Sequence, residues 1–137
     1  MAGGDVLAQL GSVGLFSQCT KRELKTVARH VETATIEAGA HLTDQGAAGD
    51  AWFGILSGSA EVLVDGEQVA VLGPNDHFGE LSLIDGRPRS ATVVALEPLT
   101  VAVLGVRMFR TLVREFPDVS EQLLAGLAAE LRQARQG

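Results

Sequence analysis

The hydrophobic pattern of the chain changes period twice, from helical to strand-like near residue 33 and back to helical near residue 105. Residues 5–30 carry helical signals, and Thr20 with Glu23 three positions later matches a capping box at the start of a helix. The apolar positions after this box recur at helical spacing: Leu24, Val27, Ala28 and Val31. The preceding segment, Val6 to Phe16, predicts a short helix followed by a turn.

Between residues 33 and 105, short β-rich runs are separated by turn residues at the spacing that is typical of a sandwich or barrel. Asp65-Gly66 predicts a two-residue hairpin, and Gly73–Asp76 and Glu97-Pro98 predict further turns. The expected strands cover residues 33–37, 41–45, 51–57, 59–64, 67–72, 77–80, 90–96 and 99–104.

The helical period that returns after residue 105 predicts two helices. The first has one apolar face, which stops at Phe116. Pro117 suits the first turn of the last helix, and Asp118 complements the positive end of that helix. The apolar stripe of the last helix consists of Val119, Leu123, Leu124, Leu127 and Leu131, and Arg132 and Arg135 lie near its negative end.

The composition agrees with a single folded domain that has an aliphatic core. Hydrophobic residues make up 46% of the 137 positions and charged residues 20%, so whole-chain disorder is excluded. The longest apolar stretch, residues 91–106, is interrupted by Glu97 and Pro98, so it predicts two strands and not a membrane span. We expect one domain over residues 1–137, with N-terminal helices in 1–32, a β region in 33–105 and two helices in 106–137.

Charge and cysteine content exclude several classes of function. The net charge is −6 and the few Lys and Arg residues are dispersed, which argues against nucleic-acid binding. Cys19 is the only cysteine, so neither an internal disulfide nor a cysteine-based metal site is possible. The N-terminus does not resemble a signal peptide, and we expect a cytoplasmic location.

The chemistry of the chain is concentrated in residues 78–92, Phe-Gly-Glu-Leu-Ser-Leu-Ile-Asp-Gly-Arg-Pro-Arg-Ser-Ala-Thr. Gly79 allows the backbone to approach a ligand, and a short helical turn at 81–83 would present free N–H groups to an anion. Arg89, which we expect to begin a new strand, suits bidentate phosphate contact, and Glu80 suits acceptance from a hydroxyl. These groups match a ligand with one phosphate and a sugar hydroxyl.

This segment resembles the phosphate-binding cassette of the cyclic-nucleotide-binding domain family. Members include the catabolite activator protein, the regulatory subunits of cyclic-AMP-dependent protein kinase and cyclic-nucleotide-gated channels. Residues 44–58 resemble the glycine-punctuated strand pair of the same family, and the resemblance extends over essentially the whole chain. It implies a mostly β fold with flanking α elements: an eight-stranded antiparallel β-roll (jelly roll) with N-terminal helices and C-terminal hinge and lid helices.

The resemblance also implies roles for individual residues. Glu80 would bind the ribose 2′-hydroxyl and Arg89 the cyclic phosphate. The rest of the phosphate cradle would come from Phe78, Gly79, Leu81, Ser82, Ser90 and Ala91, and the pocket near the base would be lined by Val62, Val69 and Ala70. The last helix, 118–135, would act as the lid. Ala134 stands where the catabolite activator protein has a base-contacting threonine, which leaves Leu131 or Arg132 to cap the base.

The implied ligand is cyclic AMP. Cyclic GMP stays an alternative ligand, because the hydroxyl of Ser90 can reach a guanine amino group. On this interpretation the ligand orders residues 78–91, and the hinge helix near 107–115 swings so that the last helix closes. The regulated effector domain or partner protein is not identified, and a homodimer through the leucine stripe 123–131 stays an alternative to packing of that stripe on the β-roll.

Other interpretations of the same residues compete with this one. Arg89 can be an ordinary surface cation, and Glu80 can be the structural partner of an arginine. His30, His41 and His77 lack the His-x-His spacing of cupin metal sites, and no nucleophile or acid–base motif is present, so we expect neither a metal nor an enzyme. A degenerate copy of the fold that binds proteins and no nucleotide is the alternative function.

Overall fold

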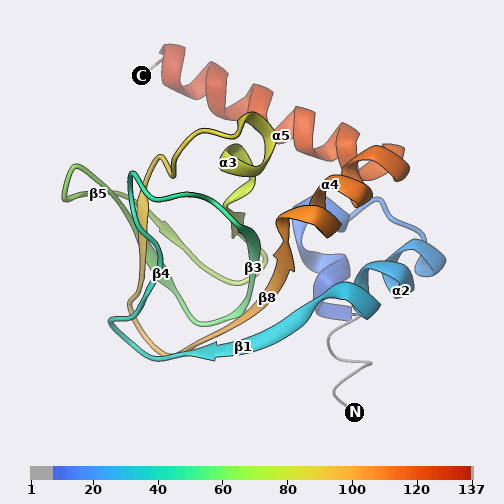
Figure 1. Ribbon diagram of the computed structural model, residues 1–137, viewed down its shortest axis with the longest axis horizontal. Coiled ribbons are helices and arrows are strands. Elements are labelled where there is room, and N and C mark those ends of the chain that lie inside the picture. The colour runs from blue at the N-terminus through green and yellow to red at the C-terminus, as the bar shows by residue number, and fades with distance from the viewer. Residues whose placement is uncertain (1–7, 137) are drawn as a thin grey trace.

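Two four-stranded sheets form the centre of the fold. The structure is a computed structural model that describes residues 8–136 (Figure 1). One sheet has the order β1-β8-β3-β6 and the other β2-β7-β4-β5, and the strand pairs are antiparallel. The strands are β1 (Glu32–Ile36), β2 (His41–Thr43), β3 (Ala51–Ser57), β4 (Ala60–Val64), β5 (Glu67–Leu72), β6 (His77–Phe78), β7 (Thr92–Ala95) and β8 (Leu99–Gly105). The predicted eight-stranded antiparallel β-roll is confirmed.

Helices flank the roll at both ends of the chain and interrupt it once. Residues 8–12 are helical and are followed by η1 (Gly14–Phe16), α2 (Lys21–His30), α3 (Glu80–Asp85), α4 (Val106–Glu115) and α5 (Pro117–Gln136). The predicted capping box is present: the Glu23 amide donates to Thr20 Oγ1 at 3.1 Å, and the Thr20 amide donates to Glu23 Oε1 at 2.9 Å. Pro117 begins α5, as predicted. Val6, where the first helix is predicted to start, lies outside the described residues.

The predicted strand boundaries are wrong on both sides of α3. The strand expected over 77–80 ends at Phe78, because Gly79 has a φ of 98° and Glu80 already begins α3. The strand expected over 90–96 begins at Thr92, so Arg89 lies before it and not within it. The backbone of Arg89 instead pairs with the loop before β3: it donates to the Ala47 carbonyl at 2.7 Å and accepts from the Gly46 amide at 2.8 Å.

The turn predicted at Asp65-Gly66 is confirmed. The two residues have φ values of 52° and 82°, and β4 and β5 pair directly on either side of them. Two successive left-handed residues form the turn whose twist matches that of the flanking strands. This hairpin carries Val62, Val69 and Ala70, three of the residues predicted to lie near a bound base.

Strand β3 separates two hydrophobic cores. Successive side chains of a strand point to opposite faces, so Trp52 and Leu56 pack with the helices, whereas Ile55 packs between the sheets. Trp52 is fully buried, and its ring contacts Phe16 of η1 at a centroid distance of 5.3 Å and Phe109 of α4 at 6.5 Å. Because of this alternation, one face of β3 packs against the helices and the other face contributes to the core between the two sheets.

Within residues 8–136, none of the helices combines the length and the apolar character needed to cross a bilayer.

Candidate functional site

A cavity of about 360 Å³ opens between α3, the segment 89–91 and the β4–β5 hairpin. The eleven residues predicted from the sequence all line it: Val62, Val69, Ala70, Phe78, Gly79, Glu80, Leu81, Ser82, Arg89, Ser90 and Ala91. The lining also includes Thr43, Leu72, His77 and Val93, which the sequence analysis did not select. The fold thus brings residues 78–82 and 89–91 of the motif together with the β4–β5 hairpin around one cavity.

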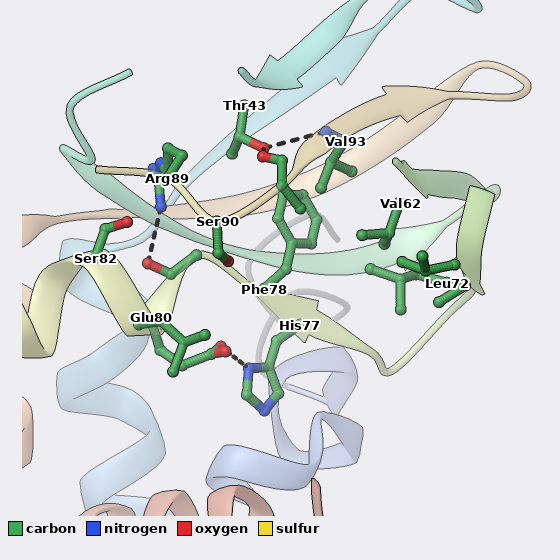
Figure 2. Close-up of a pocket in the computed structure, with 15 residues that line it drawn as sticks. Thr43, Val62, Leu72, His77, Phe78, Glu80, Ser82, Arg89, Ser90 and Val93 are labelled. Atoms are coloured by element: carbon green, nitrogen blue, oxygen red, sulfur yellow. Dashed lines mark hydrogen bonds and ion pairs between the residues drawn. The ribbon is translucent and has the colours of Figure 1, made fainter. Parts of the chain in front are cut away.

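The cavity is polar at one end and apolar at the other. Figure 2 shows Arg89 and Ser82 on one side, Val62 and Leu72 on the opposite side, and Glu80 with His77 along the edge between them. A ligand that fits this order carries an anion, then a hydrogen-bonding group, then an apolar face.

Arg89 is a cation held below the surface. Its side chain is 6% exposed; Nη1 donates to the Gly79 carbonyl at 2.9 Å, and Nη2 donates to the Ala51 carbonyl at 2.7 Å. Burial lowers the pKa of the Arg89 guanidinium, and the negative charges of Asp50 and Glu80 oppose that shift. Arginine stays charged in proteins, and carbonyl groups orient a guanidinium without neutralising it.

The carboxylate nearest to this cation is held only loosely to it. Asp50 Oδ1 lies 3.9 Å from Arg89 Nη2, and the Asp50 side chain is 92% exposed. A surface ion pair of this length contributes little, since water screens it. The positive charge is therefore available to an anion that enters the cavity.

Two glycines let the backbone approach Arg89 closely. Gly79 is left-handed, and a Cβ atom there would lie 2.8 Å from the Ala51 carbonyl oxygen and 3.0 Å from Arg89 Nη1. At Gly49 a Cβ atom would lie 2.4 Å from the Cβ atom of Ser82 and 3.2 Å from Arg89 Cζ. The loop before β3 therefore packs through Gly49 against Ser82 and Arg89, two residues that line the cavity.

Glu80 is paired with a histidine and not with an arginine. The Glu80 side chain is 10% exposed, and its Oε1 atom lies 2.7 Å from His77 Nδ1 (Figure 2). His77, which the sequence analysis considered only as a possible metal ligand, belongs to β6 and lines the cavity beside Glu80. No sequence signal distinguished it from His30 and His41.

Thr43 is a second residue that the sequence analysis missed. Its hydroxyl donates to the Ala91 carbonyl at 3.0 Å and accepts from the Val93 amide at 3.1 Å. This buried side chain ties β2 to the strand that leaves the cassette and so fixes the backbone of 91–93. The other two additions, Leu72 and Val93, lie in β5 and β7 and extend the apolar lining of the cavity.

The predicted lid does not line this cavity. None of the described side chains of α5 is among those that line it; the helix packs on η1 and α4, and Figure 1 shows it passing close to α3. The predicted apolar stripe is only partly buried: Val119, Leu123 and Leu127 pack in the core under the helices, whereas Leu124 is 66% and Leu131 55% exposed. Leu131 and Arg132 as caps of the base stay predictions, and the side chain of Ala134 lies outside the described residues.

In the part of the chain that the structure describes, no group of three or more His, Cys, Asp or Glu side chains is arranged to hold a metal ion.

The sequence profile of the cyclic nucleotide-binding domain matches residues 33–116, well over half of the 137 positions. The chain belongs to the cyclic nucleotide-binding domain family. Apart from Glu32, the matched region contains both sheets, and it also contains α3, α4 and every residue that lines the cavity. The family pattern therefore coincides with the part of the fold that builds the site.

Individual relatives agree with this assignment. The cAMP-dependent protein kinase regulatory subunit of Yarrowia lipolytica is 38% identical over 75% of this chain. The regulatory domain of Toxoplasma gondii PKA, solved with cAMP, is 32% identical with a TM-score of 0.72, over 80% of this chain and 44% of that one. The Thermus thermophilus catabolite activator protein is 30% identical with a TM-score of 0.82, over 90% of this chain and 60% of that one.

The cyclic nucleotide-binding domain described here spans 28% of the length of the Yarrowia subunit and 26% of that of the Emericella nidulans subunit. It is thus a cyclic nucleotide-binding regulatory domain like those of the kinase regulatory subunits, which carry further segments outside the matched region.

Proposed function

We propose that this domain binds a cyclic nucleotide, cyclic AMP foremost, in the 360 Å³ cavity and acts as a regulatory sensor without catalysing a reaction. The observation that carries the proposal is the buried Arg89 guanidinium, which lines the cavity, donates to two carbonyl groups and has the exposed Asp50 carboxylate only at 3.9 Å. The two carbonyl groups hydrogen-bond the buried guanidinium but leave its positive charge unneutralised. The planar guanidinium can donate two parallel hydrogen bonds, a geometry that matches a phosphate.

The remaining lining residues suit the other parts of the nucleotide. On this proposal Glu80 accepts from the ribose 2′-hydroxyl, and backbone groups from Gly79 to Ser82 and at Ala91, which line the same cavity, surround the phosphate. The apolar end of the cavity would take the base. Ser90 is exposed at the rim and is the residue that would favour cyclic GMP through its hydroxyl.

The proposed response to the ligand is a movement of α4 and α5. Helix α5 is anchored by Val119 and Leu123, which are 1% and 6% exposed, and by the partly buried Leu127, whereas Leu131 near its end is 55% exposed. A helix anchored at one end can change position at low cost. The ligand shifts the equilibrium between the two helix positions only to the extent that it binds one of them more tightly than the other.

The names of the relatives make a protein kinase the first partner to test for the output, since they are regulatory subunits of one. A cytoplasmic location and self-association of the domain stay predictions.

The first experiment is a calorimetric titration of the ligand-free domain with cyclic AMP, cyclic GMP and 5′-AMP. We expect saturable binding of a cyclic nucleotide, and the ratio of the two cyclic affinities identifies the ligand. Arg89→Ala is expected to weaken binding about a hundredfold, because a charge-assisted hydrogen bond contributes ~1.5–3 kcal/mol and the phosphate loses its cation.

Arg87→Ala is the matched control. Arg87 lies two positions away in the same segment, is exposed, and is not among the residues that line the cavity. Its removal should change the affinity less than threefold. Absence of heat with every nucleotide, in a protein shown to be folded, would reject the sensor function in favour of a protein-interaction module.

A further inference from the structure

The carboxylate proposed to bind the ribose is itself held by a second side chain. Among the described residues, His77 is the one side chain that is hydrogen-bonded to Glu80, at 2.7 Å, and both are shielded, with 26% and 10% of their side chains exposed. The two residues separate the large cavity from a small one of about 40 Å³ beneath α5, which His77, Glu80, Gln122, Leu123, Gly126 and Leu127 line. His77 therefore lies beside Glu80, at the edge where the two cavities meet.

The same nitrogen of His77 has a second neighbour. Trp52 Nε1 lies 3.2 Å from His77 Nδ1, and the two rings are 5.7 Å apart. A ring nitrogen carries either a proton or a free lone pair, so Nδ1 cannot donate to Glu80 and accept from Trp52 at once. The bond to the carboxylate is the shorter and the charge-assisted one, and bonds of that kind are about twice as strong as neutral ones. Nδ1 therefore carries its proton toward Glu80.

A carboxylate that is fixed through one oxygen keeps its other oxygen for a ligand. An ionised carboxylate offers about four acceptor positions, and His77 takes one of them on Oε1. A freely rotating Glu80 side chain would lose conformational entropy when it binds a ligand, whereas a carboxylate that is already held in place loses little of it.

We propose that His77 is a positioning residue, which orients the Glu80 carboxylate so that it accepts the 2′-hydroxyl of the bound nucleotide. This inference rests on the proposed function. It assigns to His77 a part of the discrimination between a ribose and a deoxyribose ligand, exercised through Glu80 and without contact between His77 and the nucleotide.

The chain contains a natural control for this pair. His41 Nδ1 lies 2.6 Å from Asp44 Oδ1 at the same three-residue spacing, but these side chains are 52% and 64% exposed and neither lines the cavity. The chemistry of the two pairs is the same, and only their places in the fold differ. Replacement of His41 should therefore leave ligand affinity unchanged.

The experiment measures the affinities of cyclic AMP and 2′-deoxy cyclic AMP for the wild type and for His77→Phe, His77→Asn, His77→Gln and His41→Phe. We expect His77→Phe to weaken cyclic AMP about tenfold and the deoxy analogue less than twofold, because the hydroxyl contact is what it loses. Asn places its amide nitrogen near the position of Nδ1, so His77→Asn should stay within about threefold of the wild type. Gln places its nitrogen near the position of Nε2 and should behave like Phe, which keeps the test open if His77→Phe does not fold.

Each result separates a positioning role from a structural one. Equal weakening of both nucleotides, or no weakening of either, would overturn the role of His77 while leaving the sensor function intact. A wild type that binds both nucleotides equally well would overturn it too, because no hydroxyl contact would then exist. A wild type that binds neither nucleotide would be the failure of the proposed function itself.

Discussion

The two charged residues of the site are kept below the surface by different partners. Backbone carbonyls orient Arg89, whereas the side chain of His77 orients Glu80. Backbone partners cannot be removed by substitution, so the arrangement around Arg89 depends on how closely the loop before β3 approaches.

Gly49→Ala is expected to disturb the site without touching a charged group. Its new methyl would lie 2.4 Å from the Cβ atom of Ser82, which cannot rotate away, so the loop or α3 must shift. We expect a loss of stability of ~1–3 kcal/mol, as in other overpacked positions, and a weakening of nucleotide affinity of at least tenfold. Denaturant unfolding and calorimetry measure the two effects.

Gly73→Ala serves as the control for this substitution. A Cβ atom at Gly73 meets no atom within 4 Å, so its stability should stay within ~0.5 kcal/mol of the wild type. A Gly49→Ala domain that matched the Gly73→Ala domain in both measurements would show that Gly49 and Ser82 are not closely packed.

At the scale of elements, the junction of η1, α2 and α5 contains a reporter group. Cys19 lies between η1 and α2, and burial raises the pKa of its thiol to about 11, with smaller contributions from the charges of Glu23 and Asp118. Asp118 belongs to the first turn of α5. The ionisation of Cys19 thus depends on whether α5 stays docked at this junction.

The thiolate is the reactive form of cysteine, so the raised pKa predicts slow modification of Cys19 in the folded domain. Because the folded thiol holds its proton up to a pH of about 11, its alkylation rate should keep rising with pH beyond 9.0, the ordinary value of its pKa. In the unfolded chain the rate should level off near that ordinary value. Rates of iodoacetamide labelling over this pH range, with and without denaturant, measure the difference.

The same reaction tests the movement of α5. If a saturating cyclic nucleotide draws α5 from η1, Cys19 gains solvent and loses the nearby charge of Asp118, and its labelling at pH 8 should become several-fold faster. The Arg89→Ala domain should show no such acceleration at the same nucleotide concentration. An unchanged rate in the ligand-bound wild type would mean that the first turn of α5 stays docked.

At the scale of the whole molecule, the two hydrophobic cores share strands β3 and β8. Trp52 and Leu104 belong to the core under the helices, and Ile55 and Val101 to the core between the sheets. Side chains on opposite faces of one strand cannot separate without loss of the strand itself. We therefore expect the roll and the helices around it to unfold as one cooperative unit.

Ligand binding should raise the melting temperature of this unit as a whole. A ligand at a hundredfold excess over its Kd stabilises the folded state by ~2.7 kcal/mol, which corresponds to roughly 8 °C for a domain of this size. Differential scanning calorimetry with increasing cyclic nucleotide measures this shift, and the Arg89→Ala domain at the same concentrations is the control. Two separate transitions, only one of them sensitive to nucleotide, would contradict the cooperative unit.

The sequence by itself determined the features that depend on neighbouring residues. The capping box of Thr20 and Glu23, the turn at Asp65-Gly66 and the start of α5 at Pro117 involve contacts within a few positions, so their patterns were sufficient. The residues of the cassette were also found in this way, since Glu80 and Arg89 belong to one short motif with a recognisable family pattern.

Only the tertiary structure decided which distant groups complete the site. His77 and His41 have the same spacing to a carboxylate, and the burial of β6 beside Trp52 is what distinguishes them. Strand β7, which begins at Thr92, was predicted to begin too early, because the backbone of Arg89 pairs with a loop some forty positions away. Helix α5 docks beside Phe16 and Phe109 through its first turns, so its later leucines stay outside the cavity. These outcomes depend on contacts between segments that are far apart in the chain, which a local pattern of residues does not encode.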